Sequence, residues 1–166
     1  YTPKRDYPVV FERLRKEYGS FVAVNDLSLK IEQNSFTGLL GPNGAGKSTA
    51  LKILTNLVHP TAGHAYINGY DTAKETKKAF EGVGAVIETP EYYPNLTPRE
   101  TYRYIGEILG MRKDTIQEQT ETILSKVHMT EWGDNKIGTF SKGMRQRISL
   151  GLALIDNPSI VILDEP

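Results

Sequence analysis

Alternating and continuous apolar segments fill the first half of the chain. Residues 9–15 and 22–31 alternate apolar and polar side chains in part, and a glycine-containing turn separates them. This pattern predicts an antiparallel pair of strands. Residues 36–40 and 83–87 are short, mostly apolar runs, which are typical of buried strands. Residues 47–57 carry apolar side chains at nearly helical spacing, so we expect a helix there.

Two shorter elements are expected before the middle of the chain. Residues 65–67 are followed by Asn68-Gly69, a pair typical of a tight turn after a strand. Residues 72–80 predict a short helix.

Helix-start signals dominate the second half. Thr97-Pro98-Arg99-Glu100 combines an N-cap threonine, a proline at the first helical position and a capping-box glutamate, and Gly110 supplies a stop. We expect Asp114 to cap a second helix that ends near residue 129, and Ser141 to open a third that ends near residue 156. Residues 160–163 predict a final strand. The chain therefore reads as one domain in which a helical insert, residues 90–140, interrupts a core made of residues 1–89 and 141–166.

Composition restricts the class of protein. A chain of 166 residues with 39% hydrophobic and 24% charged side chains is an ordinary globular domain. Lys plus Arg and Asp plus Glu number 20 each, so we expect no nucleic acid partner. The absence of cysteine excludes disulfides and thiolate metal sites and agrees with a reducing cytoplasm. No apolar run approaches the roughly 18 residues that span a bilayer.

The most specific motif lies between a predicted strand and a predicted helix. Its residues match the pattern G-x-x-x-x-G-K-[ST] and are Gly41, Pro42, Asn43, Gly44, Ala45, Gly46, Lys47, Ser48 and Thr49. The glycines let successive backbone N–H groups point inward, and the start of the helix adds a positive dipole end. We expect Lys47 to reach the β- and γ-phosphates of a nucleotide, Ser48 to ligate Mg²⁺, and Thr49 to hydrogen-bond the α-phosphate. The motif therefore predicts a Mg·ATP site.

An acidic pair follows the last predicted strand. Asp164 is expected to hold the magnesium ion, through water, and Glu165 to orient and deprotonate the attacking water. Two acids at a strand end also cap turns, so this pair alone would leave both interpretations open. The phosphate loop favours the catalytic one.

A second motif precedes the acidic strand. Residues 140–147 read Phe-Ser-Lys-Gly-Met-Arg-Gln-Arg and resemble the Leu-Ser-Gly-Gly-Gln signature of ABC (ATP-binding cassette) ATPases, with the other motifs in the family's order along nearly the whole chain. The match departs from the family at Phe140, Lys142 and Met144. The resemblance implies that Ser141, Lys142, Gly143 and Met144 contact the ATP held by a second subunit, with Ser141 and Gly143 at its γ-phosphate. It follows that two cassettes dimerise around two ATP molecules.

The resemblance also implies roles for three residues outside these motifs. Tyr18 lies where the family places an aromatic residue that stacks on adenine, with Val24 lining the same face; without the resemblance, Tyr18 would read as a core aromatic. Glu88 stands where the family has a glutamine that touches Mg²⁺ and the attacking water. A carboxylate ligates magnesium but donates no hydrogen bond. Glu88, in the context Glu-x-Pro-x-x-Tyr-Pro-Asn-Leu-Thr at residues 88–97, resembles the branch that exports lantibiotics or bacitracin-like peptides and confers immunity to them. A tolerated substitution in another small exporter is the alternative.

The implied fold is an α/β P-loop NTPase (RecA-like) core with an N-terminal antiparallel β subdomain and a helical insert. The implied function is the ATP-binding and hydrolysing subunit of an ABC transporter, cytoplasmic and peripheral on the inner face of the membrane. Its partners would be a transmembrane permease subunit and a second ATP-binding cassette. The alternatives are a non-transport ABC ATPase, acting in translation or on DNA, and a chain that binds ATP without hydrolysing it. The last arises because we expect the chain to be incomplete at its C-terminus, ending before a γ-phosphate-contacting histidine of the family.

Overall fold

The computed structural model describes residues 7–88 and 92–165. The chain forms two compact units, Tyr1–Glu81 and Gly82–Pro166. Along the chain the elements are β1 (Val9–Tyr18), β2 (Phe21–Ile31), α1 (Lys47–Leu54), β3 (Ala62–Ile67), β4 (Tyr70–Asp71), α2 (Thr76–Ala79), β5 (Val83–Val86), α3 (Pro98–Ile108), α4 (Lys113–Lys126), the short 3₁₀ turns η1 (Thr130–Trp132) and η2 (Ile137–Thr139), α5 (Lys142–Leu154) and β6 (Ile160–Leu163). None of the helices in the described ranges is both long and apolar enough to cross a bilayer.

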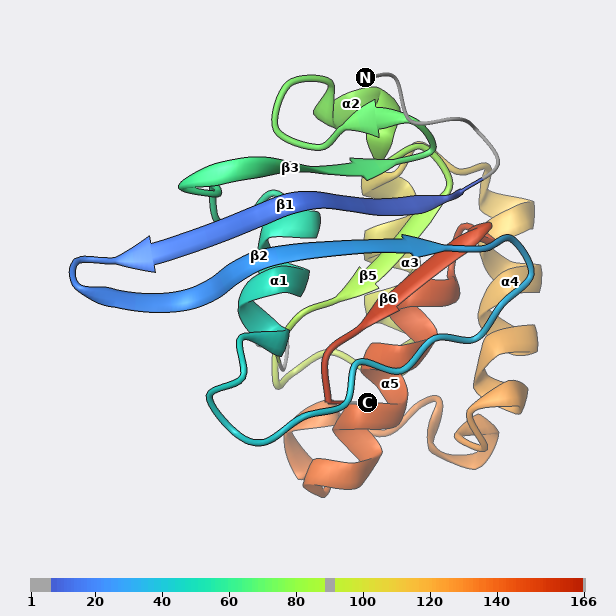
Figure 1. Cartoon of the computed structure of the whole chain (residues 1–166). Coiled ribbons are helices and arrows are strands. Elements are labelled where there is room, and N and C mark those ends of the chain that lie inside the picture. The colour runs from blue at the N-terminus through green and yellow to red at the C-terminus, as the bar shows by residue number, and fades with distance from the viewer. Residues whose placement is uncertain (1–6, 89–91, 166) are drawn as a thin grey trace. The chain divides into compact units, whose positions relative to one another are not determined.

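The first unit contains an antiparallel sheet with strand order β2-β1-β3-β4 (Figure 1). β1 lies between its two neighbours, so that Val9 is opposite Ile31 of β2 and Ile67 of β3. α1 packs against β2 and β3. The buried apolar residues of these elements are Val9, Val10, Phe11, Leu14, Val24, Ala50, Ile53, Leu54, Ala65 and Ile67. The predicted antiparallel pair and the predicted helix after the phosphate loop are confirmed.

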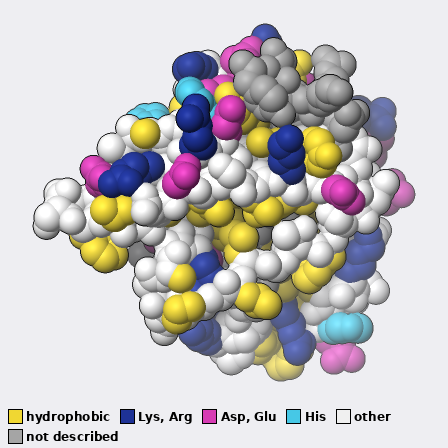
Figure 2. Space-filling view, in the orientation of Figure 1, with side chains coloured by type: hydrophobic (Ala, Val, Ile, Leu, Met, Phe, Trp, Pro, Cys, Tyr) yellow, Lys and Arg dark blue, Asp and Glu magenta, His cyan; other side chains and the backbone are white. Residues whose placement is uncertain are grey.

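Charge on the sheet of the first unit is mixed. Over these strands, Figure 2 shows Lys and Arg side chains beside Asp and Glu side chains. Arg15 and Glu17 of β1 form an ion pair.

The second unit combines a short parallel sheet with the helices α3, α4 and α5. β5 and β6 pair in parallel, with Val83 opposite Ile160 and Val86 opposite Leu163. α5 packs against β5, and Gly84 permits this approach because a Cβ at that position would overlap the Ala153 carbonyl oxygen. The strands predicted at the two ends of this unit are both confirmed.

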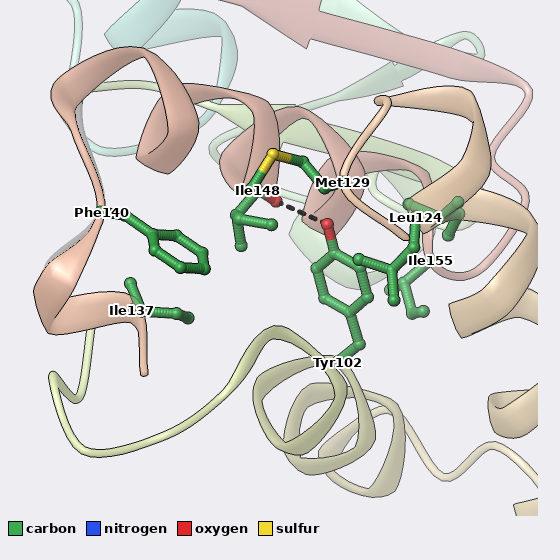
Figure 3. Close-up of a cluster of buried hydrophobic side chains, with 8 residues drawn as sticks. Tyr102, Leu124, Met129, Ile137, Phe140, Ile148 and Ile155 are labelled. Atoms are coloured by element: carbon green, nitrogen blue, oxygen red, sulfur yellow. Dashed lines mark hydrogen bonds between the residues drawn. The ribbon is translucent and has the colours of Figure 1, made fainter. Parts of the chain in front are cut away.

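The core of the second unit surrounds one tyrosine. Tyr102 of α3 is fully buried, and its hydroxyl donates a hydrogen bond to the Ile148 carbonyl of α5 at 3.1 Å (Figure 3). Burial raises the pKa of Tyr102. The buried side chains of the cluster are Tyr102, Ile123, Leu124, Met129, Ile137, Phe140, Ile148 and Ile155. This cluster fixes α3 and α4 against α5.

The predicted start of α3 is confirmed in detail. The Thr97 hydroxyl accepts a hydrogen bond from the Glu100 backbone N–H, and the Glu100 carboxylate accepts one from the Thr97 backbone N–H at 2.8 Å. Pro98 is the first residue of the helix. Gly110 follows the helix with φ of 75°, which ends it as expected. The division into a core and a helical insert at residues 90–140 stays a prediction.

The strand predicted at residues 36–40 is wrong. Phe36 and Leu40 are 101% and 95% exposed, and the segment has no regular secondary structure. Within the described ranges, neither sheet includes a strand that pairs with it. An apolar run forms a strand when a neighbouring strand pairs with its backbone hydrogen-bonding groups. The pattern of apolar residues does not show whether such a neighbouring strand is present.

The cap predicted for α4 is also wrong. The N-cap position belongs to Arg112, and α4 begins at Lys113. Asp114 therefore lies within the first turn, where its carboxylate accepts a hydrogen bond from the Thr115 backbone N–H at 2.8 Å. A carboxylate in the first turn is favourable because it faces the positive end of the helix dipole. The same preference explains why Asp114 resembled a cap in the sequence.

Candidate functional site

The phosphate-loop sequence forms a turn that leads directly into α1. Gly44 and Gly46 both have φ of 84°, in the left-handed region that favours glycine. Gly46 is the N-cap of α1, and the Ala45 backbone N–H donates to the Pro42 carbonyl at 3.2 Å. The first turn of α1, which is described throughout, contains no acidic residue. The positive end of this helix is therefore presented to an anion at the loop.

The loop rests on the backbone of β2. A Cβ added at Gly46 would overlap the Ala23 carbonyl oxygen and lie 3.1 Å from Cγ2 of Val24. Val24 itself is buried, with 6% of its surface exposed. The structure thus places Val24 against the backbone of the phosphate loop, while its contact with ATP stays a prediction.

The Lys47 ammonium lies at the phosphate loop. Its Nζ donates hydrogen bonds to the carbonyl oxygens of Gly41 at 2.7 Å and Pro42 at 2.9 Å. Ser48 and Thr49 follow in the first turn of α1 and are half-buried. One cation and a set of helix-start N–H groups therefore meet at one loop, a combination that fits a triphosphate.

Tyr18 ends β1, opposite Phe21 of β2. Its side chain is 49% exposed, so it is not a core aromatic. The next register pairs are Glu17 with Val22 and Lys16 with Val24. Tyr18 therefore lies at the hairpin that joins β1 to β2, the strand on which the phosphate loop rests. An exposed ring at this position is compatible with an adenine contact, which stays a prediction.

Three acidic residues follow the carboxyl ends of the two parallel strands. Asp164 follows β6 directly, and its backbone N–H donates to the Val86 carbonyl at 3.0 Å. Glu88 follows β5 by two residues, and Glu165 follows Asp164. Glu88 and Glu165 have φ of 70° and 48°, and both are exposed. The carboxyl edge of a parallel sheet is where α/β proteins hold their ligands. Within the described ranges, no group of three or more His, Cys, Asp or Glu side chains is arranged to hold a metal ion, so the predicted magnesium site stays a prediction.

The structure describes only part of the sequence that follows these acids. Thr89, Pro90 and Glu91, which belong to the segment after Glu88, lie outside the described residues, as does Pro166. The described residues resume at Tyr92, whose hydroxyl donates a hydrogen bond to the Arg145 carbonyl of α5 at 3.2 Å. Burial raises the pKa of Tyr92.

The signature sequence begins α5. Ser141 is the N-cap, and its Oγ accepts a hydrogen bond from the Met144 backbone N–H at 3.2 Å. Phe140, the first residue of the motif, is buried and packs edge-to-face on Trp132, with ring centroids 6.4 Å apart. This packing fixes the start of the motif to the core of the unit. Lys142 and Gly143 are exposed. The structure therefore presents an exposed helix start; its contact with the ATP of a second subunit stays a prediction.

Sequence reasoning missed two residues beside the predicted ones. The Lys16 ammonium lies 4.8 Å from the ring centroid of Tyr18, and Nε2 of Gln146 donates to the Glu165 carbonyl at 2.9 Å. Lys16 could have been found because residues two apart on a strand share a face. No sequence signal points to Gln146, because its partner is a backbone atom far along the chain.

Comparison with known proteins assigns the family. Residues 24–166 match the sequence profile described as ABC transporter. The chain belongs to the ABC transporter family. The linearmycin resistance ATP-binding protein LnrL of Bacillus subtilis is 37% identical over 155 residues, which cover 93% of this chain and 50% of that protein. The bacitracin transport ATP-binding protein BcrA of Bacillus licheniformis is 37% identical over 153 residues, which cover 92% of this chain and 49% of that protein. The chain thus spans about half the length of these ABC relatives.

Solved ABC structures share the fold. An ATP-binding subunit of an ABC transporter superposes with a TM-score of 0.83 at 27% identity, covering 95% of this chain and 66% of that one. A nucleotide-free ATP-binding cassette superposes with a TM-score of 0.81 at 26% identity, covering 96% of this chain and 69% of that one. The predicted P-loop NTPase fold is therefore confirmed.

Proposed function

We propose that this chain is the nucleotide-binding part of an ABC transporter subunit that binds Mg·ATP at the phosphate loop and hydrolyses it to drive transport. The observation that carries the proposal is the loop itself. Gly44 and Gly46 adopt left-handed backbone angles, and the Lys47 ammonium is held by the carbonyls of Gly41 and Pro42 at the start of α1. The family to which the chain belongs supports the same conclusion.

The acids at the end of the parallel sheet have separate roles in this proposal. The family resemblance assigns Ser48 and Asp164 to Mg²⁺, which would neutralise charge on the β- and γ-phosphates. Glu165 orients the attacking water and accepts its proton. Glu88 contributes a further oxygen ligand in place of the usual glutamine. Glu88 and Glu165 are exposed residues, which is compatible with these roles.

The exposed start of α5 supports a dimeric mechanism. Ser141 and Gly143 lie at a helix N-terminus whose N–H groups suit an anion, and Lys142 adds a positive charge there. In the proposed assembly, this surface binds the γ-phosphate of the ATP held by a second cassette. A membrane permease subunit is the partner that uses the resulting motion.

The names of the relatives support an antibiotic as the cargo. LnrL is a linearmycin resistance protein and BcrA is a bacitracin transport protein. We therefore propose that the transporter removes an antimicrobial compound, with a peptide antibiotic as the first candidate. Deletion of the gene should increase sensitivity to such a compound by severalfold. Unchanged sensitivity across a panel of peptide antibiotics would exclude this cargo class and leave the ATP site unaffected.

Calorimetric titration with ATP tests the nucleotide site. The full protein should bind ATP in a magnesium-dependent manner, and Lys47→Ala should abolish measurable binding because the triphosphate loses its ammonium partner. Lys77→Ala is the matched control, since Lys77 is an exposed lysine of α2 in the same unit. Equal affinity in the Lys47→Ala and Lys77→Ala variants would refute the proposed site.

The rate of phosphate release tests the general base. Glu165→Gln should retain ATP binding and lower turnover by on the order of 10² to 10⁴-fold, because the amide cannot accept the proton. Glu131→Gln is the control, as Glu131 is an exposed acid of η1 in the same unit. Undiminished turnover in Glu165→Gln would remove this residue from the mechanism.

A further inference from the structure

We propose that Lys16 is a positioning residue for adenine, which covers one face of the Tyr18 ring so that the opposite face stacks on the base. The inference rests on the proposed function, because it needs ATP at the phosphate loop and Tyr18 at the adenine. It adds a residue that no motif contains. The contact on which it depends is the 4.8 Å distance between Nζ of Lys16 and the centroid of the Tyr18 ring.

The Lys16 ammonium is fixed by a second partner. Its Nζ donates a hydrogen bond to the carbonyl oxygen of His59 at 2.8 Å. A lysine side chain held at one end by its strand and at the other by this carbonyl loses much of the rotamer freedom that usually weakens surface contacts. The cation is therefore located over the ring by two interactions.

The loop that supplies the His59 carbonyl is itself attached to β1. The Thr61 backbone N–H donates to the Arg15 carbonyl at 2.8 Å, and the Thr61 hydroxyl accepts a hydrogen bond from the Glu17 backbone N–H at 3.0 Å. Thr61, just before β3, is thus hydrogen-bonded to the two residues that flank Lys16 in β1. Displacing the lysine would require either breaking its bond to His59 or moving this attached segment.

The location of the ring connects this arrangement to the nucleotide. Tyr18 ends the β1–β2 hairpin, and Ala23 and Val24 of the same hairpin contact Gly46 of the phosphate loop. A base attached to a phosphate tail at that loop lies within reach of the hairpin. Tyr18 is 49% exposed, so the ring has surface left after one face is covered by Lys16. An ammonium on that face also attracts the ring electrostatically and limits its rotation.

The chain provides a matched comparison for the Lys16–Tyr18 pair. The Lys78 ammonium lies 5.4 Å from the ring centroid of Tyr70 in the same unit, and neither residue belongs to the hairpin that supports the phosphate loop. Lys78→Met therefore removes the same kind of contact at another place. Its nucleotide affinity should equal that of the unmodified protein.

The experiment measures the affinities of ATP and of tripolyphosphate by calorimetry in the full protein. Lys16→Met should weaken ATP about two- to fivefold, the size expected from an exposed cation–π contact, and leave tripolyphosphate unchanged. Lys16→Arg should retain the ATP affinity because it keeps the cation. In a Tyr18→Leu background, Lys16→Met should cause no further loss, since the ring on which it acts is absent.

Each other result overturns the inference. Equal weakening of ATP and tripolyphosphate by Lys16→Met would show that the lysine acts on phosphate. The same loss with and without Tyr18, or no loss at all, would show that it does not act through the ring. Tyr18→Leu without effect on ATP would remove the adenine contact and this inference together, with the phosphate loop unaffected. The proposed function fails separately, if Lys47→Ala leaves ATP binding intact.

Discussion

Two glycines of the phosphate loop allow the cost of a steric collision with β2 to be measured separately from the cost of the backbone conformation. Gly44 and Gly46 have the same φ of 84°. A Cβ at Gly44 would meet nothing within 4 Å, whereas a Cβ at Gly46 would overlap the Ala23 carbonyl oxygen and lie 3.1 Å from Val24 Cγ2. Alanine substitutions at the two positions therefore share the backbone cost and differ in the collision with β2.

The magnitudes follow from these two contributions. An L-residue in the left-handed region costs about 1–2 kcal/mol, and this cost applies to both Gly44→Ala and Gly46→Ala. Forcing an extra methyl group into a packed position costs about 1–3 kcal/mol more, and this applies to Gly46→Ala alone. With a urea m-value of about 2 kcal/mol/M, the added cost lowers the midpoint of unfolding by on the order of 1 M.

Urea unfolding without nucleotide is the assay that separates the two variants. Nucleotide is left out so that the two midpoints compare the folded chain alone and do not depend on affinity for ATP. Gly46→Ala should unfold at a clearly lower urea concentration than Gly44→Ala. Equal midpoints would refute the reasoning that β2 limits the space behind Gly46.

Three further predictions concern the second unit. Tyr102→Phe should lower the free energy of unfolding by about 1 kcal/mol because the hydrogen bond to the Ile148 carbonyl is lost. Tyr104→Phe, on the exposed side of the same helix, is the control. Equal urea midpoints for the two variants would contradict the prediction. Thr97→Ala should cost about 1 kcal/mol through loss of the N-cap, and an unchanged rate of amide hydrogen exchange in the first turn of α3 would argue against it. The hydrogen bond from the Thr97 backbone N–H lowers the pKa of Glu100 below its ordinary 4.5, so its stabilising contribution is complete above that pH and is lost as the pH falls through the lowered pKa. The urea midpoint of Glu100→Gln should therefore decline less below pH 4.5 than that of the unmodified protein, and parallel acid-side profiles would exclude this role.

The sequence predicted correctly those features that depend on residues close together in the chain. The capping box at Thr97 and Glu100, the cap at Ser141 and the glycine stop at Gly110 need only neighbours a few residues away, and all three are present. The phosphate loop is local in the same sense, since its glycines and its lysine act within one turn.

Long-range partners set the limit of the sequence predictions. The segment at residues 36–40 has the composition of a strand and lacks a pairing strand within the described ranges. The Lys16–His59 bond, at 2.8 Å, and the Gln146–Glu165 bond, at 2.9 Å, join residues from separate elements. Neither hydrophobic periodicity nor motif spacing predicts these contacts, because each contact depends on which distant segments of the chain lie side by side in the folded structure.

α5 carries the predicted signature motif at its start and a hydrogen bond from the Gln146 side chain to the Glu165 backbone carbonyl in its second turn. Ser141 is the N-cap of this helix, and Gln146 lies five residues later, about 7.5 Å along its axis. In the proposed assembly, the group that senses the neighbouring subunit's ATP and the backbone that carries the general base are therefore connected through little more than one turn of rigid helix. Any displacement of α5 in that assembly would act on the Glu165 backbone through the Gln146 hydrogen bond.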